Sequence, residues 1–218
     1  MQRQVTHCRR RMLQFKPVVL AVVDPQTLVL TLTSPEASVA GGACDALEKF
    51  ASTCPYSLSW LASRSHHDYQ HHAFAFTAET NRSILLQLGV LDAALTILTT
   101  GQEAVRAQAS CLLATLISAE RAREAWRLRP DPSGYDVVVG LIAPDKHPVL
   151  QENGTSIVAD LAQEYSSRIE LARRGVVMPL ASLLASTVPE TQRSSLRALA
   201  LLLHEFDNRT ELGKTPGT

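Results

Sequence analysis

The sequence is poor in several features that would point to particular functions. Aromatic residues make up only 5% of the 218 residues, and the 21 basic residues equal the 21 acidic ones, so the formal net charge is zero. A chain without excess positive charge has no global field that would attract nucleic acid or an anionic membrane. No run of 18 apolar residues occurs, so no membrane-spanning helix is expected. We therefore expect neither a nucleic-acid partner nor a membrane partner.

Cysteine is also scarce. Four cysteines are too few for a disulfide framework in a chain of this length: Cys8, Cys44, Cys54 and Cys111. Cys44 and Cys111 fall within apolar helical patterns, where a free thiol behaves as a small, buried hydrophobe. Together these features predict a reducing, cytoplasmic compartment. Three glycosylation sequons argue for the opposite, at Asn81, Asn153 and Asn208, but we interpret Asn81 and Asn208 as helix-entry residues.

Catalytic and cofactor motifs are absent from the sequence as well. It contains no glycine-framed serine elbow, no paired cysteine ligands and no dinucleotide fingerprint. Gly213-Lys214-Thr215 resembles the end of a phosphate-binding loop, but the upstream glycine is missing and too few residues follow to form the helix that would hold phosphate. We predict that the protein is not an enzyme and binds no cofactor.

What the sequence does contain is a pair of amphipathic helical patterns separated by a glycine. Leu91, Ala94, Leu95 and Leu98 recur at helical spacing, and so do Val105, Ala109, Leu112 and Leu116. Between them lies Gly101-Gln102-Glu103, in which the acidic residue favours the positive N-terminus of the second helix. The pattern predicts two helices joined by a tight corner.

This two-helix unit recurs at a nearly constant period. Leu98 and Ile142 are 44 residues apart, and Ile142 and Leu184 are 42 residues apart. Helix breaks next to an acidic residue, as expected at helix starts, recur at Ser34-Pro35-Glu36, Gly101-Gln102-Glu103, Pro144-Asp145 and Pro189-Glu190. A shorter helix is predicted at residues 81–90 and again at 167–176, each closed by a glycine, Gly89 or Gly175, that can take a positive φ.

Three helices per repeat of about 42 residues, with a glycine corner after the first, resemble the armadillo-repeat family. Short segments such as Leu85-Leu86-Gln87-Leu88-Gly89 and Ala43-Cys44-Asp45-Ala46-Leu47 strengthen the resemblance, which covers residue 27 to the C-terminus. It implies an all-α, armadillo-type right-handed superhelical solenoid with about three full repeats and partial repeats at both ends.

The repeat pattern predicts the following organisation. Residues 1–26 form a ragged N-terminal segment, 27–51 a partial repeat, 52–76 an insertion, 77–207 three-helix repeats, and 208–218 the truncated start of another repeat. Leu28, Leu30 and Leu32 alternate as in a strand, but the repeat context predicts a helix. The basic residues before Pro17 and the apolar run after it resemble a targeting segment, but we prefer to interpret them as an incomplete first repeat.

Incomplete repeats at both ends predict a fragment of a longer solenoid. A self-contained array ends in a capping repeat with a polar outer face, and no such repeat is evident. We expect exposed aliphatic surface around Leu196, Leu199 and Leu203, which would fray or self-associate. Neighbouring repeats of a longer chain are therefore among the expected partners.

The insertion at residues 52–76 departs from the repeat in composition. It contains four of the seven histidines and five of the eleven aromatic residues. We interpret it as disordered or wrongly retained sequence, in preference to an exposed binding loop at a repeat corner. His66-His67 and His71-His72 have a spacing that can hold zinc on a helix, with Cys54 and Asp68 as further candidates. No third ligand has a clear geometry, so we predict solvated histidines and no metal site.

The function is expected to reside on the solenoid surface. In the import receptors and catenins, to which the chain is similar, a third-helix asparagine in each repeat binds the partner backbone. The matching positions here are Lys49, Thr115, Asp160 and approximately Leu202. The resemblance makes Lys49, Thr115 and Asp160 candidates for a groove that contacts a partner, although the missing asparagines argue against the import mechanism.

We therefore predict a non-enzymatic protein–protein interaction scaffold in the cytoplasm, with other proteins as partners. The resemblance also implies a cilium or flagellum as a setting. The alternatives are a peptide-binding adaptor of the nuclear-import or catenin type and an armadillo module of a ubiquitin-ligase system.

Overall fold

The computed structural model describes residues 25–52, 78–205 and 209. Within these ranges every regular element is an α-helix, which confirms the predicted all-α class. The helices are α2 (Pro25–Thr31), α3 (Ala37–Ser52), α4 (Ala78–Gln87), α5 (Val90–Thr100), α6 (Glu103–Ile117), α7 (Glu120–Arg127), α8 (Ser133–Leu141), α9 (Pro148–Leu161), α10 (Tyr165–Arg173), α11 (Val177–Leu183) and α12 (Pro189–Leu202). The targeting segment, most of the insertion with its histidines, and Gly213-Lys214-Thr215 lie outside the described residues.

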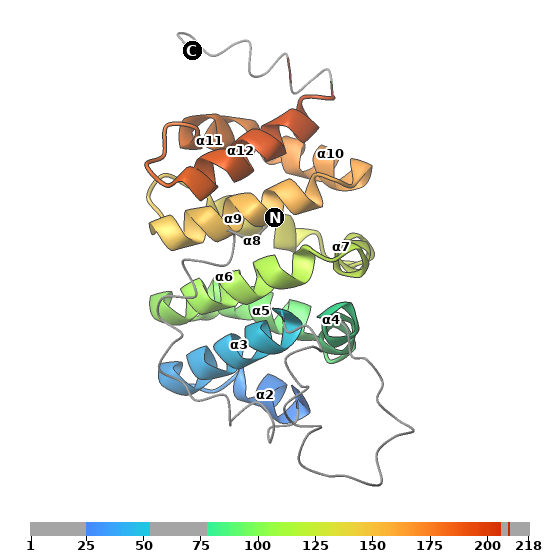
Figure 1. Ribbon diagram of the computed structural model, residues 1–218, viewed down its shortest axis with the longest axis vertical. Coiled ribbons are helices and arrows are strands. Elements are labelled where there is room, and N and C mark those ends of the chain that lie inside the picture. Colours follow the sequence, from blue (N-terminus) through green and yellow to red (C-terminus); the bar gives the residue numbers. More distant parts are fainter. Residues whose placement is uncertain (1–24, 53–77, 206–208, 210–218) are drawn as a thin grey trace, which may run out of the picture.

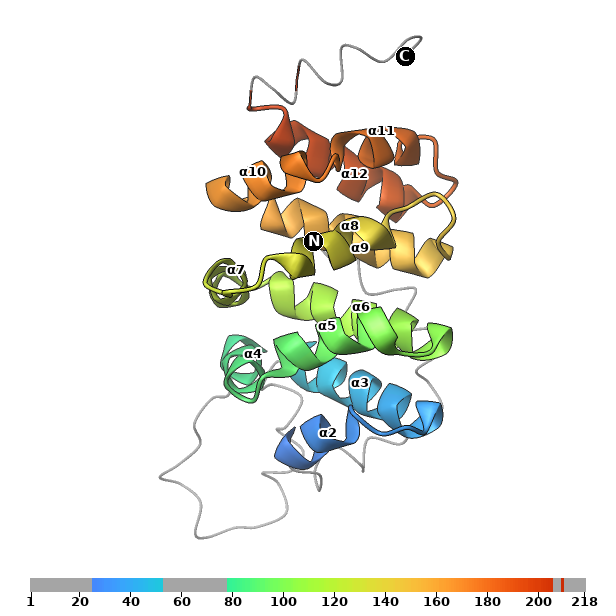
Figure 2. The same ribbon diagram turned by 180° about the vertical axis from the view of Figure 1, so that it is seen from behind.

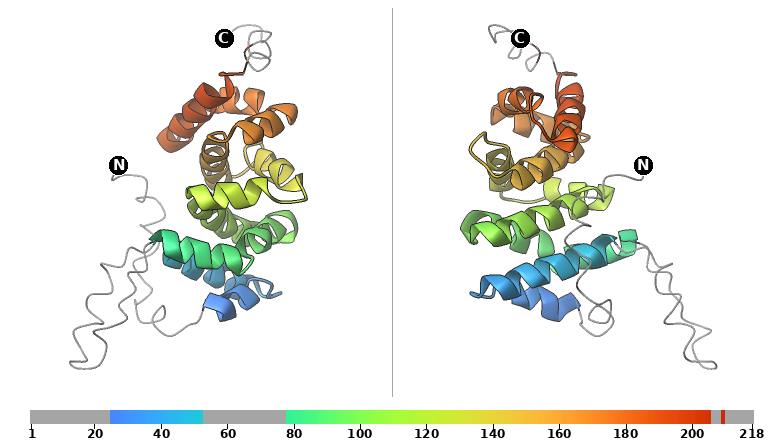
Figure 3. Two further views of the ribbon diagram at one scale, coloured as in Figure 1. Left: turned by 90° about the vertical axis from the view of Figure 1, so that its right-hand side faces the viewer. Right: turned by 60° about the vertical axis from the view of Figure 1, so that its left-hand side comes forward.

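The helices form three parallel rows that run along the long axis of the molecule. The third helices of the repeats, α3, α6, α9 and α12, form one layer, and each packs against the next. The second helices, α2, α5, α8 and α11, form the layer behind them (Figures 1 and 2). The first helices, α4, α7 and α10, lie along one edge, as the side views in Figure 3 also show. The chain is thus a stack of similar helical layers.

The predicted apolar stripes form the interior of this stack. Leu91, Ala94, Leu95 and Leu98 of α5 are buried, as are Val105, Ala109, Leu112 and Leu116 of α6. These side chains belong to one hydrophobic core that extends from Leu32 to Leu202. Since each layer covers the apolar face of its neighbour, the stack buries surface that a single repeat would expose.

The two predicted glycine corners are confirmed. Gly89 has a φ of 74° and Gly175 a φ of 68°, in the left-handed region where other residues are strained. The corresponding corner between α7 and α8 has no glycine. There the Asp131 carboxylate accepts a hydrogen bond of 2.9 Å from the backbone N–H of Ser133 and helps to start α8.

Two predicted helix starts are wrong. Helix α9 begins at Pro148 instead of Pro144-Asp145, because Pro148 occupies the first turn and the His147 Nδ1 accepts a bond of 3.3 Å from the backbone N–H of Val149. Asn81 lies inside α4 and does not begin it. Its side-chain amide instead donates to the carbonyl of Phe50 at 2.8 Å, near the C-terminus of α3. Asn81 therefore joins two helices across the insertion.

No individual helix among the described residues combines the length and apolarity that a membrane span requires. The bent pair Glu79–Gln87 and Val90–Thr100, with an angle of 71° between its helices, meets that requirement only when both are counted together.

Candidate protein-binding face

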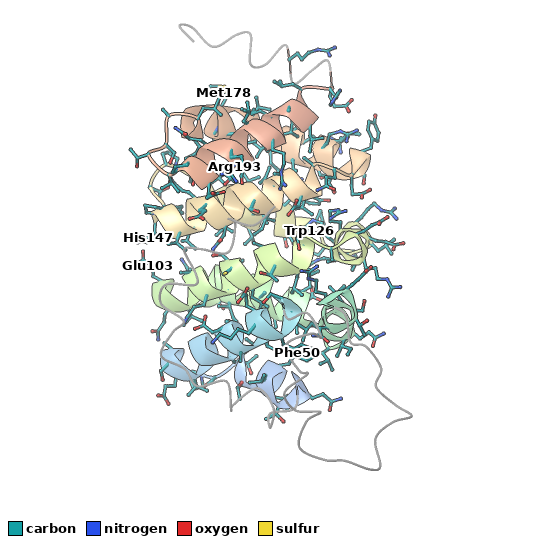
Figure 4. All side chains as sticks on the ribbon, in the orientation of Figure 1. Phe50, Glu103, Trp126, His147, Met178 and Arg193 are labelled. Carbon is teal, nitrogen blue, oxygen red and sulfur yellow. The ribbon has the colours of Figure 1, made fainter. Side chains whose placement is uncertain are left out.

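The layer formed by α3, α6, α9 and α12, called here the third-helix face, carries the candidate residues. In Figure 4 Arg193 marks this face on α12, whereas Trp126 lies near the edge of first helices. The face presents polar side chains because the apolar side of each third helix is turned toward the core. It extends without interruption over four layers (Figure 1).

Hydrogen bonds between side chains join each third helix to the next. Gln108 donates to Asp45 at 3.2 Å, and Thr115 donates to Glu48 at 3.3 Å, which joins α6 to α3. Asn153 donates to Ser110 at 2.8 Å and joins α9 to α6. These bonds fix the rotation of neighbouring helices, so the polar groups on the face are held in place.

At the α12 end of the face, which is the upper end in Figure 1, the link between layers is ionic. The Arg197 guanidinium of α12 donates to the Asp160 carboxylate of α9 at 2.7 Å. Gln163 donates to the same oxygen at 3.1 Å. Asp160 is buried, so its charge is compensated within the protein before any partner arrives.

The structure places the predicted groove residues at equivalent points of successive layers. Lys49 and Thr115 are half-buried on α3 and α6, and Asp160 is buried on α9. The fourth position requires a correction, because Leu202 is fully buried in the core. Pro148 and Pro189, the first residues of α9 and α12, are 41 residues apart, so the equivalent of Asp160 is the half-buried Leu201. The use of these residues in binding remains a prediction.

Burial gives the carboxyls of this face unusual electrostatics. It raises the pKa values of Asp45, Glu48 and Asp160, because a charged carboxylate is less stable away from water. The hydrogen bonds from Gln108 and Thr115 oppose this effect at Asp45 and Glu48, and Arg197 opposes it at Asp160. Asp45 and Glu48 thus accept hydrogen bonds from neutral donors, and the nearby charge of Lys49 further opposes the rise of their pKa values, whereas Asp160 pairs directly with a cation.

No protein-family profile matches the chain. Armadillo repeat-containing protein 3 of Homo sapiens is 25% identical over 182 residues, which cover 84% of this chain and 18% of that protein. A designed armadillo repeat protein in complex with the peptide (KR)4 aligns with a TM-score of 0.66 at 17% identity, covering 88% of this chain and 70% of the design. The chain has the fold of an armadillo-repeat solenoid. Computationally designed armadillo repeat proteins for modular peptide recognition align with a TM-score of 0.59 at 17% identity, covering 88% of this chain and 87% of the design.

The sequence comparison concerns only a small part of the relative. The chain spans 18% of the length of Armadillo repeat-containing protein 3, so the similarity bears on the repeats and not on the whole relative. The expected resemblance to the armadillo-repeat family is confirmed. Members of this family and fold are typically binding scaffolds without catalytic activity.

The armadillo layers are also joined by arginines at the corners, which the sequence analysis missed. Arg123 donates to the carbonyls of Ile117 and Ser118 at 3.3 and 3.0 Å, at the C-terminus of α6. Arg168 donates to those of Ala162 and Gln163 at 3.2 and 3.4 Å, at the C-terminus of α9. A cation there satisfies carbonyls that lack helical partners and complements the helix dipole.

The next corner repeats this arrangement, and carboxylates complete it. Arg209 donates to the Leu203 carbonyl at 3.4 Å, just beyond α12. Glu164 lies 3.8 Å from Arg123, and Glu205 lies 3.3 Å from Arg168. The spacing of Arg123, Arg168 and Arg209, 45 and then 41 residues, is the signal in the sequence that could have identified these corner residues.

An aromatic contact fixes the edge where the first and second helices meet. The rings of Trp126 and Tyr135 contact edge to face, with centroids 5.5 Å apart. The Tyr135 hydroxyl forms a hydrogen bond of 2.9 Å with Ser167 of the following repeat. Arg174 stacks over the Tyr135 ring at 5.3 Å. These contacts stabilise the layers from the edge of first helices, away from the third-helix face. The polar groups of that face are therefore not needed for them.

Proposed function

We propose that this chain is a non-enzymatic protein–protein interaction scaffold whose third-helix face binds an extended segment of its partner. The observation that carries the proposal is the continuous row of fixed polar groups over four layers, from Asp45 on α3 to Arg197 on α12. A regular row of donors and acceptors suits an extended chain, whose own polar groups also recur at a regular spacing. Among the described residues, no group of three or more potential metal ligands offers a different chemistry.

The chemistry of the lower half of the face favours a basic segment. Asp45 and Glu48 are half-buried, and burial raises their pKa values although Gln108 and Thr115 donate hydrogen bonds. A Lys or Arg of the partner placed beside them would stabilise both charged carboxylates. One designed armadillo protein of similar fold binds the basic peptide (KR)4, which supports the same kind of partner here.

Backbone recognition through asparagines is not part of this proposal. The equivalent positions carry Lys49, Thr115, Asp160 and Leu201. None of these side chains has the separate NH2 donor and carbonyl acceptor of an amide, and the Thr115 hydroxyl already donates its proton to Glu48. Recognition through the partner's charged side chains is therefore the better match to the residues present.

Peptide binding in solution tests the proposal. The fluorescence anisotropy of a labelled (KR)4 peptide should rise with protein concentration, and added salt should weaken the binding. The double variant Asp45→Asn/Glu48→Gln should bind about tenfold more weakly. A matched control is Glu120→Gln/Glu124→Gln, which removes the same charge from exposed positions on α7. Equal losses of peptide affinity in both variants would mean that only the net charge of the protein matters. Absence of binding would contradict the basic-partner proposal.

The proposal also includes a cytoplasmic location, with the cilium or flagellum as the setting implied by the family resemblance. Fluorescence microscopy of the tagged chain in ciliated cells tests it. Exclusion of the tagged chain from both compartments would contradict this part of the proposal and leave the binding proposal unaffected.

A further inference from the structure

The upper end of the described stack exposes apolar residues at positions that the interior layers bury. Ser110, Thr155 and Leu196 are equivalent residues of α6, α9 and α12, with the same spacing as the corner arginines. Ser110 and Thr155 are 0% exposed, whereas Leu196 is 61% exposed. Leu98, Ile142 and Leu184 are a second equivalent set, with exposed fractions of 5%, 0% and 40%. The interior positions are covered by the layer above, and the described chain has no such layer above α11 and α12 (Figure 1).

The lower end of the described stack also exposes an apolar residue whose equivalents in the interior layers are buried. Val39 of α3 is 40% exposed, but its equivalents Val105 and Leu150 on α6 and α9 are buried. In each interior junction, the lower side of one layer covers the upper side of the preceding one. The lower side of the α2–α3 layer therefore resembles the lower sides of the interior layers, each of which covers the upper side of the layer before it.

The side chains at the two ends also complement each other in size. In the interior junction of α6 and α9, Asn153 on the lower side of α9 donates to Ser110 on the upper side of α6. The equivalents at the free ends are Gly42 below and Leu196 above. Gly42 is exposed, and no described atom lies within 4 Å of the position that a Cβ would occupy. A large residue on the upper side therefore matches an open position on the lower side.

From this complementarity we propose that the chain associates head to tail with a second copy of itself. The α2–α3 end of one copy covers the α11–α12 end of the other, continues the stack and buries Leu184 and Leu196 near Val39 and Gly42. This contact joins two different surfaces, so each added copy leaves one end of each kind free. The association uses the two ends of the stack and does not require a partner bound along the polar row of the third-helix face.

Sedimentation equilibrium over a range of protein concentrations tests the proposal. The average mass of the full chain should increase with concentration and pass the mass of a dimer. Leu196→Glu, which blocks the upper end, and Gly42→Glu, which blocks the lower end, should each raise the dissociation constant by about tenfold or more. Gly42 is an exposed helical residue, so a glutamate there does not impair helix formation. Leu128→Glu, at an exposed apolar residue away from both ends, should associate like the unaltered chain.

A mixture of the two blocked variants distinguishes head-to-tail association from other modes. Each variant keeps one intact end, and the two intact ends complement each other, so the mixture should form 1:1 dimers and no larger species. A monomeric mixture, or a chain that is monomeric at every concentration, would overturn the proposal.

Discussion

At the scale of single residues, the half-buried carboxyls of the third-helix face make stability depend on pH. Burial raises the pKa of Glu48 above its ordinary value of 4.5, and the hydrogen bond from Thr115 offsets only part of this rise. A carboxyl with a raised pKa binds its proton more tightly in the folded state than in the unfolded state. Its ionisation therefore destabilises the fold as the pH rises from about 4.5 through the folded-state pKa.

The substitution Glu48→Gln should for this reason stabilise the protein at pH 7. The glutamine oxygen can still accept the hydrogen bond from Thr115, and the unfavourable buried charge is removed. At pH values below the ordinary pKa of 4.5, where the carboxyl is protonated in both states, the advantage should disappear. Urea unfolding at pH 7 and at about pH 3.5, roughly a unit below that pKa, measures both effects.

Glu170→Gln is the matched control, because hydrogen bonding to Arg174 lowers the pKa of Glu170. A lowered pKa stabilises the fold above the ordinary value and loses that effect as the pH falls through the folded-state pKa. Glu170→Gln should therefore reduce stability at pH 7. The explanation would be wrong if both substitutions changed stability in the same direction at pH 7.

At the scale of helices, the corners between repeats follow one pattern with one departure. Arg123 and Arg168 cap the preceding third helix and each lies near a glutamate of the next corner. On α4, Arg82 occupies the position equivalent to that of Arg123 on α7. The residue of the next corner that is equivalent to Glu164 is Ala119, which has no carboxylate. The Nε of Arg82 is buried and, like that of Arg123, has no hydrogen-bond partner among the described residues, but Arg123 has the Glu164 carboxylate at 3.8 Å. Burial also lowers the pKa of Arg82.

Introducing the missing carboxylate by Ala119→Glu should stabilise the protein by about 0.5 to 1 kcal/mol. The backbone at Ala119 (φ −88°, ψ 139°) nearly equals that at Glu164 (φ −91°, ψ 131°), so the new side chain can adopt the arrangement of Glu164. The start of α7 is close to α4, since Arg121 donates to Ser83 at 3.2 Å. Thermal unfolding of the variant and of the unaltered chain measures the gain.

A double-mutant cycle with Arg82→Met shows whether the gain depends on the intended pair. In the Arg82→Met background, Ala119→Glu should give no stabilisation. An equal gain in both backgrounds would assign the effect to the N-terminus of α7, where any acidic residue is favourable.

At the scale of the whole molecule, stability depends on layers that cover one another. Leu113 is fully buried in α6, which packs against α3, α5 and α9. Leu113→Asp should unfold the chain, because an unpaired buried carboxylate costs several kcal/mol and a whole domain is stable by only about 5 to 15 kcal/mol. Circular dichroism should show loss of the helical signal and of the cooperative melt. Leu128→Asp, at an exposed position, is the control, and native-like melting of Leu113→Asp would contradict the layered core.

The sequence alone was sufficient to predict the all-α class and the solenoid fold, although it misplaced the starts of α4 and α9. Helix formation depends on apolar residues spaced three and four apart, as in α5 and α6, and on local breaks such as Gly89 and Gly175. These signals lie within one turn or one corner of the chain. The repeat period then follows from counting, because each layer must bury the same kind of face.

The contacts between layers were decided only by the tertiary structure. Gln108 and Asp45 are 63 residues apart, and their hydrogen bond depends on how far α6 is rotated and shifted against α3. The same is true of the burial of Asp160 and of Leu202, and of the bond from Asn81 to Phe50 across the insertion. A shift of one residue along a helix turns a side chain by 100°, from the surface into the core. Repeat spacing locates a position only to within about one residue, and packing against the neighbouring layer determines which side chain faces the partner.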